Sequence, residues 1–181
     1  MKIVIIGNGG TGKSTLGDRL SKELGIPITH LDKLSWKDNW HRVPEDDFSV
    51  SLQKVMEQKA MIIEGWAYQS TMKDRLRWAD IIIYLQYPLE YCLSTVFKRN
   101  EEYNNRDYPY DLFTGNRVAH NYLYREALER VYYQNEPIVQ QWLSSGEFTD
   151  KEIFVFTSIG HLNDSYNGLV SFLRSLVGEN F

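Results

Sequence analysis

The chain has one cysteine among its 181 residues, and its apolar runs are all short. Cys92 has no second cysteine to pair with, so the chain cannot form an internal disulfide, and we expect a reducing, cytoplasmic location. A membrane-spanning helix needs about 20 consecutive apolar residues, and no run approaches that length. The amino-terminal residues form the pattern of a core strand, which argues against a targeting peptide.

Positive charge is also scarce, because 20 Lys and Arg residues face 24 Asp and Glu residues and the formal net charge is −4. Proteins that bind duplex DNA depend on basic side chains to neutralise phosphates, so we do not expect direct DNA binding. The sequence has no second phosphate loop and no Asn-Lys-x-Asp motif, which argues against a GTPase. It also lacks the Cys/His spacing of a zinc site.

One glycine-rich stretch follows the apolar residues 3–6. Residues 7–15 match the pattern G-x-x-x-x-G-K-[ST] of a phosphate-binding loop. Glycines let such a loop curl so that its amides approach an anion, and the positive end of the following helix points at the same place. We expect this whole stretch to bind the phosphates of ATP: Gly7, Asn8, Gly9, Gly10, Thr11, Gly12, Lys13, Ser14 and Thr15.

Two residues of this loop have more specific expected roles. Lys13 can reach the β- and γ-phosphates, and the Ser14 hydroxyl can ligate Mg²⁺. The sequence therefore predicts ATP and Mg²⁺ as cofactors.

Strand-like and helical patterns alternate along the chain, which predicts an α/β fold with a parallel sheet flanked by helices in one domain, 1–181. The expected strands are 2–6, 27–31, 61–63, 81–85 and 152–156. Helices are expected at 13–24, 44–59, 88–99, 118–143 with a break at Pro137, and 165–176. A further short helix is expected to end at residue 75. Residues 33–43 read as a polar, tryptophan-bearing loop. The pattern lapses at 100–116, and we interpret 100–117 as a lid insert.

Acidic residues follow the second and third expected strands. Carboxyl ends of parallel strands converge on one crevice, so these positions are candidate site residues. Asp32 could hold Mg²⁺ through a water or accept a proton from a substrate hydroxyl; the alternative is a helix or turn cap. Glu64 is either a site residue or a structural acid, and Gly65 permits close approach by a ligand. His30 lies on the second expected strand, and we expect it to be packed and hydrogen-bonded.

Three tryptophans lie beside these acids. Trp36, Trp40 and Trp66 could stack on a planar or sugar-like ligand, or they could cover the edge of the core. Arg42 and Arg75 could clamp an anionic substrate on the acceptor side.

Arginines also flank the expected lid. Arg99 and Arg106 border the irregular insert, and Arg117 and Arg125 follow it. Phosphoryl transfer spreads negative charge over oxygens that an arginine can stabilise. We expect Arg99 and Arg106 to act from the lid as catalytic residues, together with Lys13 and Asp32.

The order of these motifs resembles a known family. The phosphate loop is followed by His30-Leu31-Asp32, by Trp36 and Trp40, by residues 62–65, and by Arg75 shortly before the fourth strand. Together they resemble the adenylate-kinase-related proteins labelled DNA topology modulation proteins. The resemblance implies a nucleoside-monophosphate-kinase-like sheet in the order 2-3-1-4-5 with a lid, and a suspected role near DNA supercoiling or gene regulation. Adenylate kinases have Asp-Gly-x-Pro-Arg where residues 64–68 read Glu-Gly-Trp-Ala-Tyr, so AMP is not implied as acceptor.

The sequence thus favours an ATP-dependent phosphotransferase that acts on a small hydroxyl or phosphate compound. Ser14 and Asp32 are the expected metal ligands. An ATP-binding regulatory protein with little kinase activity, linked to DNA topology or gene regulation, is the alternative. The acceptor pocket is expected to contain Asp32, Trp36, Arg42, Glu64, Gly65, Trp66 and Arg75.

Overall fold

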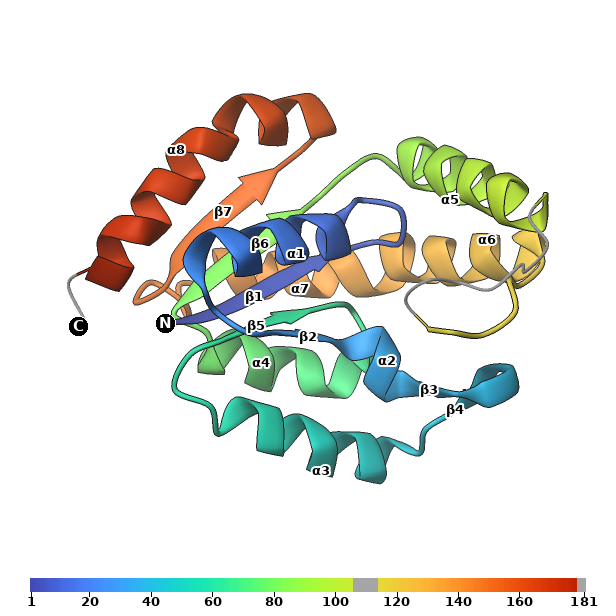
Figure 1. The fold of residues 1–181 in the computed structure, drawn as a ribbon, viewed down its shortest axis with the longest axis horizontal. Helices are drawn as coiled ribbons and strands as arrows, with labels where there is room; N and C mark the ends of the chain where they lie inside the picture. Colours follow the sequence, from blue (N-terminus) through green and yellow to red (C-terminus); the bar gives the residue numbers. More distant parts are fainter. Residues whose placement is uncertain (106–113, 179–181) are drawn as a thin grey trace.

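The computed structural model describes residues 1–105 and 114–178, which form an α/β fold around a parallel sheet (Figure 1). The five strands lie side by side in the order β2 (Ile28–His30), β5 (Met61–Glu64), β1 (Lys2–Gly7), β6 (Ile81–Leu85) and β7 (Glu152–Phe156). Every neighbouring pair is parallel. Counted along the chain, this order is 2-3-1-4-5, so the predicted fold class and strand order are confirmed.

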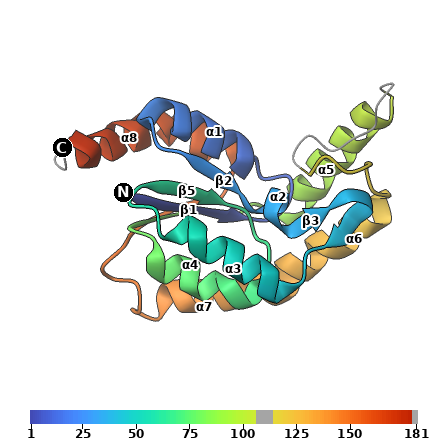
Figure 2. The ribbon, with the colours of Figure 1, turned by 60° about the horizontal axis from the view of Figure 1, so that its bottom comes forward.

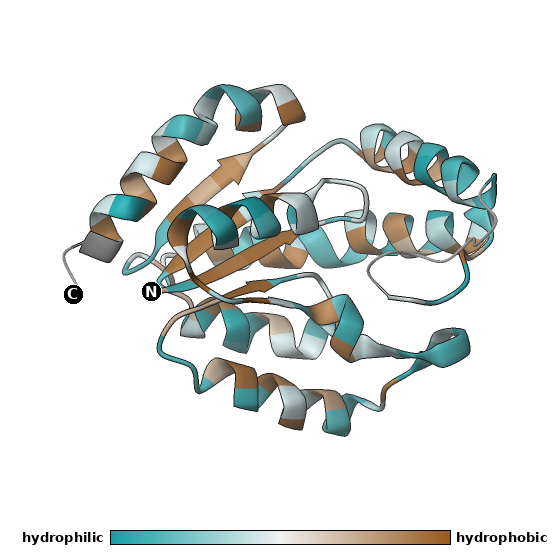
Figure 3. Cartoon of the chain, viewed as in Figure 1, coloured by the Kyte–Doolittle hydropathy of each residue, from teal (hydrophilic) through white to brown (hydrophobic). Residues whose placement is uncertain are grey.

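Helices cover both faces of the sheet (Figure 2). One face carries α1 (Lys13–Leu24) and α8 (Ile159–Gly178), and the other carries α3 (Glu45–Met56), α4 (Met72–Trp78) and α7 (Glu136–Ser144). Successive side chains of a strand point to opposite faces, so Ile3 and Ile5 join one buried cluster while Val4 and Ile6 join the other. This double burial explains the almost uniformly apolar strands in Figure 3.

The predicted loop at 33–43 is wrong in detail, because most of it has regular structure. After β2 the chain forms α2 (Leu31–Ser35), β3 (Trp36–Lys37), the 3₁₀ turn η1 (Asp38–Trp40) and β4 (His41–Arg42). Strands β3 and β4 pair antiparallel, with Trp36 opposite Arg42. Pairs this short carry no alternation that a sequence could reveal. We call residues 36–42 the arm, and it extends away from the main sheet (Figure 1).

The expected end of the helix near Arg99 is also wrong. Helix α5 (Leu89–Asn104) continues for five residues beyond it. Asn100 is buried, and its amide nitrogen donates to the Asn121 side-chain oxygen at 2.8 Å, so contacts with the next helix, α6 (Asn121–Arg130), favour helix where the local sequence is polar. Residues 106–113, including Arg106, lie outside the described residues, and the lid stays a prediction.

The predicted break at Pro137 is confirmed. A wide π-helical turn, η3 (Val131–Asn135), separates α6 from α7. Proline has no N–H to donate to the carbonyl four residues earlier, and its ring collides with that carbonyl, so the helix widens before it.

Other boundaries differ from the sequence pattern by a few residues. Helix α3 ends at Met56, a 3₁₀ turn η2 (Gln69–Thr71) precedes α4, and α8 begins six residues before the expected Ser165. Among the helices of the described residues, none is both long enough and apolar enough to cross a membrane.

Candidate active site

The phosphate loop joins β1 to α1 in the curled form that anion binding requires. Gly12 precedes the helix with φ 83°, a left-handed conformation that suits glycine. A side chain at Gly10 would approach the Cys92 carbonyl oxygen to 2.7 Å, so the loop also needs glycine there for its contact with α5. The first turn of α1 carries no acidic residue, and its positive end remains available to an anion.

Asn8 organises the loop from within. It is buried, its side-chain oxygen accepts from the Gly9 amide at 2.8 Å, and its main-chain oxygen accepts from the Thr11 hydroxyl at 2.9 Å. The same main-chain oxygen accepts from Lys13 Nζ at 3.1 Å. The Asn8 amide nitrogen donates to the carbonyl of Leu128 in α6 at 2.9 Å. The loop is thereby fixed to a helix 120 residues away, a contact that no sequence signal indicated.

A cavity of about 520 Å³ opens beside this loop. It brings together many of the residues singled out in the sequence: Asn8, Gly9, Gly10, Gly12, Lys13, Ser14, Thr15, Asp32, Trp36, Trp40, Trp66 and Arg99. Gly7 and Thr11 belong to the loop but do not line the cavity. Further walls come from α5, from Thr114 in the segment before α6, from α6 and from the wide turn after it, including Thr95, Tyr103, Tyr124 and Val131. These residues were missed because they meet the loop only through helix packing.

Asp32 and Ser14 line this cavity from different elements. Asp32 lies in the first turn of α2, directly after β2, and Ser14 lies in the first turn of α1. Mg²⁺ prefers hard oxygen ligands, and it is commonly held by one or two protein groups together with substrate phosphates. A hydroxyl and a carboxylate on the same cavity fit that requirement.

The arm closes one side of the cavity by reaching the chain beyond α5. The Trp40 amide donates to the Asn116 side-chain oxygen at 3.2 Å, and the Trp40 indole N–H donates to the Arg117 carbonyl. Its ring also meets Trp36 and Tyr124 edge to face, with ring centres 5.3 and 6.3 Å away. Aromatic side chains from the arm and from α6 therefore form one continuous wall.

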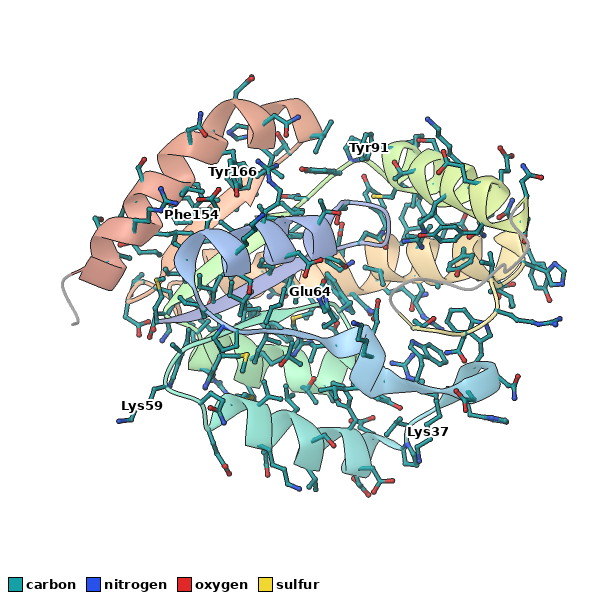
Figure 4. All side chains as sticks on the ribbon, in the orientation of Figure 1. Lys37, Lys59, Glu64, Tyr91, Phe154 and Tyr166 are labelled. Atoms are coloured by element: carbon teal, nitrogen blue, oxygen red, sulfur yellow. The ribbon has the colours of Figure 1, made fainter. Side chains whose placement is uncertain are left out.

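Glu64 does not line the cavity. In the paired strands β2 and β5 it lies opposite His30, and its Oε1 is 2.6 Å from His30 Nδ1. His30 Nε2 is 3.1 Å from Asp18 Oδ1 on α1, so the imidazole connects two carboxylates. Hydrogen bonding to Glu64 raises the pKa of His30. Glu64 is buried beneath α1 (Figure 4). Through His30 it takes part in a hydrogen-bonded chain that connects β5, β2 and α1.

Arg75 is likewise absent from the cavity wall. It is fully buried, and its guanidinium donates to the carbonyls of Gly65 at 2.9 Å and Trp66 at 2.5 Å. Burial lowers the pKa of Arg75 to about 9. Gly65 itself has φ 125°, and a side chain there would meet Leu31 at 3.1 Å, so the close approach is to α2. Arg75 thus supports the turn that presents Trp66 to the cavity.

The remaining arginines are divided between the cavity and the surface. Arg99, on α5, is half-buried and lines the cavity. Arg42 is exposed, and it stacks on Tyr68 at 4.2 Å and Trp36 at 5.0 Å on the outside of the arm. Arg117 and Arg125 do not line the cavity, and Arg125 pairs with Glu129 along α6.

Comparison with solved structures identifies the architecture. A shikimate kinase from Acinetobacter baumannii, in complex with shikimate, matches with a TM-score of 0.59 and 17% identity over 96% of this chain and 93% of that chain. Shikimate kinases from Bacteroides thetaiotaomicron and Aquifex aeolicus match with TM-scores of 0.52 and 0.54 at 16% and 15% identity. Those matches cover 96% and 98% of this chain, and 98% and 99% of the others.

The chain has the P-loop kinase fold. No protein-family model and no curated protein sequence matches it. At this level of identity the likeness concerns the fold, and it does not confirm the DNA topology modulation family suggested by the order of motifs.

Proposed function

We propose that this chain is a P-loop phosphotransferase that moves the γ-phosphoryl group of ATP to a small acceptor. The observation that carries the proposal is the shared cavity: the phosphate loop lies on one side of it and the Asp32 carboxylate lines it from another element. The fold that the chain shares with kinases supports the same class of reaction.

The nucleotide side of the proposal rests on the loop and its neighbours. Main-chain amides of residues 9–14 and the amino-terminal end of α1 bind phosphate oxygens. Lys13 lies in the loop with its ammonium on the Asn8 carbonyl, and it turns to the β- and γ-phosphates when they bind. Arg99, which lines the same cavity, stabilises the charge that develops on the transferred group.

Ser14 and Asp32 are the residues proposed to hold Mg²⁺. Bound to these oxygens, the ion would offset the negative charge of the phosphates. Asp32 also has the chemistry of a general base, since a carboxylate near an acceptor hydroxyl can take its proton during transfer.

The acceptor side is aromatic. Trp36, Trp40 and Trp66 line the same cavity as Asp32, and such rings favour planar or sugar-like compounds. Arg42 and Arg75 do not face the cavity, so the proposal assigns them no contact with the acceptor. We therefore propose a small compound with a hydroxyl group as the acceptor.

The proposal is tested by ADP release from purified protein with Mg·ATP and a panel of nucleosides, nucleotides, sugars and hydroxy acids, including shikimate. We expect at least one compound to raise the rate about tenfold or more. Asp32→Asn should lower kcat about 100-fold, because it removes both a metal ligand and a base. Asp38→Asn, at an exposed position of the arm that does not line the cavity, is the matched control. ADP release that no acceptor on a broad panel changes would contradict the proposal.

A further inference from the structure

A second cavity, of about 460 Å³, lies at the carboxyl ends of β6 and β7 on the face covered by α7. In Figure 1 this helix runs behind the sheet, and in Figure 2 it lies beneath it. The second cavity shares no lining residue with the first. Its walls come from the turn after β6, the start of the loop after β7, the wide turn η3 and α7: Gln86, Tyr87, Pro88, Tyr132, Tyr133, Glu136, Pro137, Gln140 and Thr157.

Pro137 explains how one stretch of helix supplies so much of the wall. The wide turn it causes places Tyr132, Tyr133 and Glu136 on the same cavity. The rings of Tyr132 and Tyr133 meet edge to face, with centres 5.2 Å apart. Wide turns of this kind are frequent at functional sites.

Two residues that line this cavity each carry a buried polar atom with no hydrogen-bond partner among the described residues. The two atoms are Oε1 of Glu136 and the hydroxyl of Tyr87, which come from different elements. Glu136 is only 1% exposed. Leaving a buried polar group unsatisfied costs about 1–3 kcal/mol, and more for a charged group. A ligand that donates hydrogen bonds to the carboxylate removes that cost.

The cavity has the chemistry of a cation site. None of its nine lining residues is basic, one is acidic, and three are tyrosines. Tyrosine faces attract organic cations, and an N–H donor that carries charge forms a strong hydrogen bond with a carboxylate. The amide of Gln140 and the hydroxyl of Thr157 add neutral polar groups around the same space.

We propose that this second cavity is a separate ligand site that binds a small organic cation with N–H donors, such as an amidine or a guanidine, with Glu136 as its anionic partner. The two cavities share no lining residue, so the proposal does not rest on the phosphotransferase function, and Lys13 of the phosphate loop is the charged side chain that acts on Glu136 from the first site. Burial raises the pKa of Glu136 to about 7, and a bound cation would favour the ionised form.

The test uses benzamidine as the probe and benzamide as its neutral counterpart of nearly the same shape. Binding is measured by calorimetry, and NMR shift changes near Tyr132 and Tyr133 locate it. We expect saturable benzamidine binding that is at least tenfold tighter than benzamide binding. Glu136→Gln should weaken it at least tenfold, whereas Asp164→Asn, at an exposed position of α8, should leave it unchanged.

Glu136→Gln keeps the shape of the side chain and removes a buried charge, so it should fold; a urea unfolding curve checks this. Tyr133→Ala provides a second variant, because Tyr133 is 66% exposed and its removal should weaken benzamidine binding without unfolding the protein. The proposal is overturned by equal binding of benzamide, by unchanged benzamidine affinity in Glu136→Gln, by binding that leaves Tyr132 and Tyr133 unshifted, or by no saturable binding at about 1 mM.

Discussion

The side-chain amide of Asn8 donates a 2.9 Å hydrogen bond to the carbonyl of Leu128, and this bond ties the phosphate loop to α6. Leu128 also packs so closely on the loop that a side chain at Gly9 would approach its Cδ2 to 2.7 Å. The shape of the loop therefore depends on a helix far along the chain as well as on its own glycines.

We predict that Asn8→Ala weakens both folding and nucleotide binding. The substitution removes the hydrogen bond that Asn8 donates to the Leu128 carbonyl and the one that it accepts from the Gly9 amide, which costs about 1–3 kcal/mol in the free energy of unfolding. ATP affinity should fall about tenfold, because the loop loses its fixed shape. Urea unfolding and calorimetry measure the two effects. Asn163→Ala, at an exposed position of α8, is the control, and equal effects in both variants would contradict the role given to Asn8.

Arg75 offers a test of structural support against substrate contact. Arg75→Ala leaves the Gly65 and Trp66 carbonyls without their donor, and we predict a loss of about 3 kcal/mol in the free energy of unfolding. Arg77→Ala, on the same helix, removes an exposed pair with Glu147 and should have a far smaller effect. A stable Arg75→Ala protein that only raises the KM of the acceptor would show that Arg75 contacts substrate.

His30 should make stability fall as pH rises. Its hydrogen bond to Glu64 raises its pKa in the folded state above 6.5. The folded protein then binds the proton more tightly than the unfolded chain, so the stabilisation is fully present below about pH 6.5 and is lost as pH rises through the folded pKa. We predict that His30→Gln flattens this part of the pH profile of unfolding. A profile that is unchanged would show that the imidazole is not linked to folding.

Glu136 should also make stability fall as pH rises, but over a lower range of pH. Burial raises its pKa from 4.5 to about 7, so the folded state holds a proton that the unfolded chain releases. The stabilisation from this proton is fully present below about pH 4.5. It is lost as pH rises through about 7, which lowers the free energy of unfolding by about 2–3 kcal/mol. Glu136→Gln should remove this slope and make the protein more stable at pH 8. Urea unfolding between pH 4.5 and 8 measures the slope and the stability of the variant. A variant that is less stable than the wild type at pH 8 would contradict the destabilising burial of the Glu136 carboxylate.

Local signals account for what the sequence could predict. The apolar runs, the glycine-rich loop and Pro137 each determine backbone geometry nearby, so the strands, the phosphate loop and the break in the helical stretch 118–143 were predicted. The strand order was expected from the family resemblance, and the sheet confirms it. The place of Asp32 at the carboxyl end of β2 follows from the parallel sheet, and the cavity includes it.

Long-range packing decides the rest. The arm forms a ribbon because Trp40 bonds to the chain around Asn116, and α5 extends because Asn100 meets Asn121. The sequence analysis predicts that Arg75 clamps an anionic substrate, yet Arg75 lies in the interior, where two carbonyls accept its hydrogen bonds. These partners are distant in sequence, so no pattern of spacing could reveal them.

The central claim is that residues 7–15 bind the phosphates of ATP, and calorimetric titration with Mg·ATP tests it most directly. Lys13→Ala is compared with Lys22→Ala, an exposed lysine at the other end of α1. We predict saturable binding by the wild-type and Lys22→Ala proteins, and a loss of about 100-fold or more in affinity for a folded Lys13→Ala protein. Equal ATP affinity in the Lys13→Ala and wild-type proteins would contradict the claim.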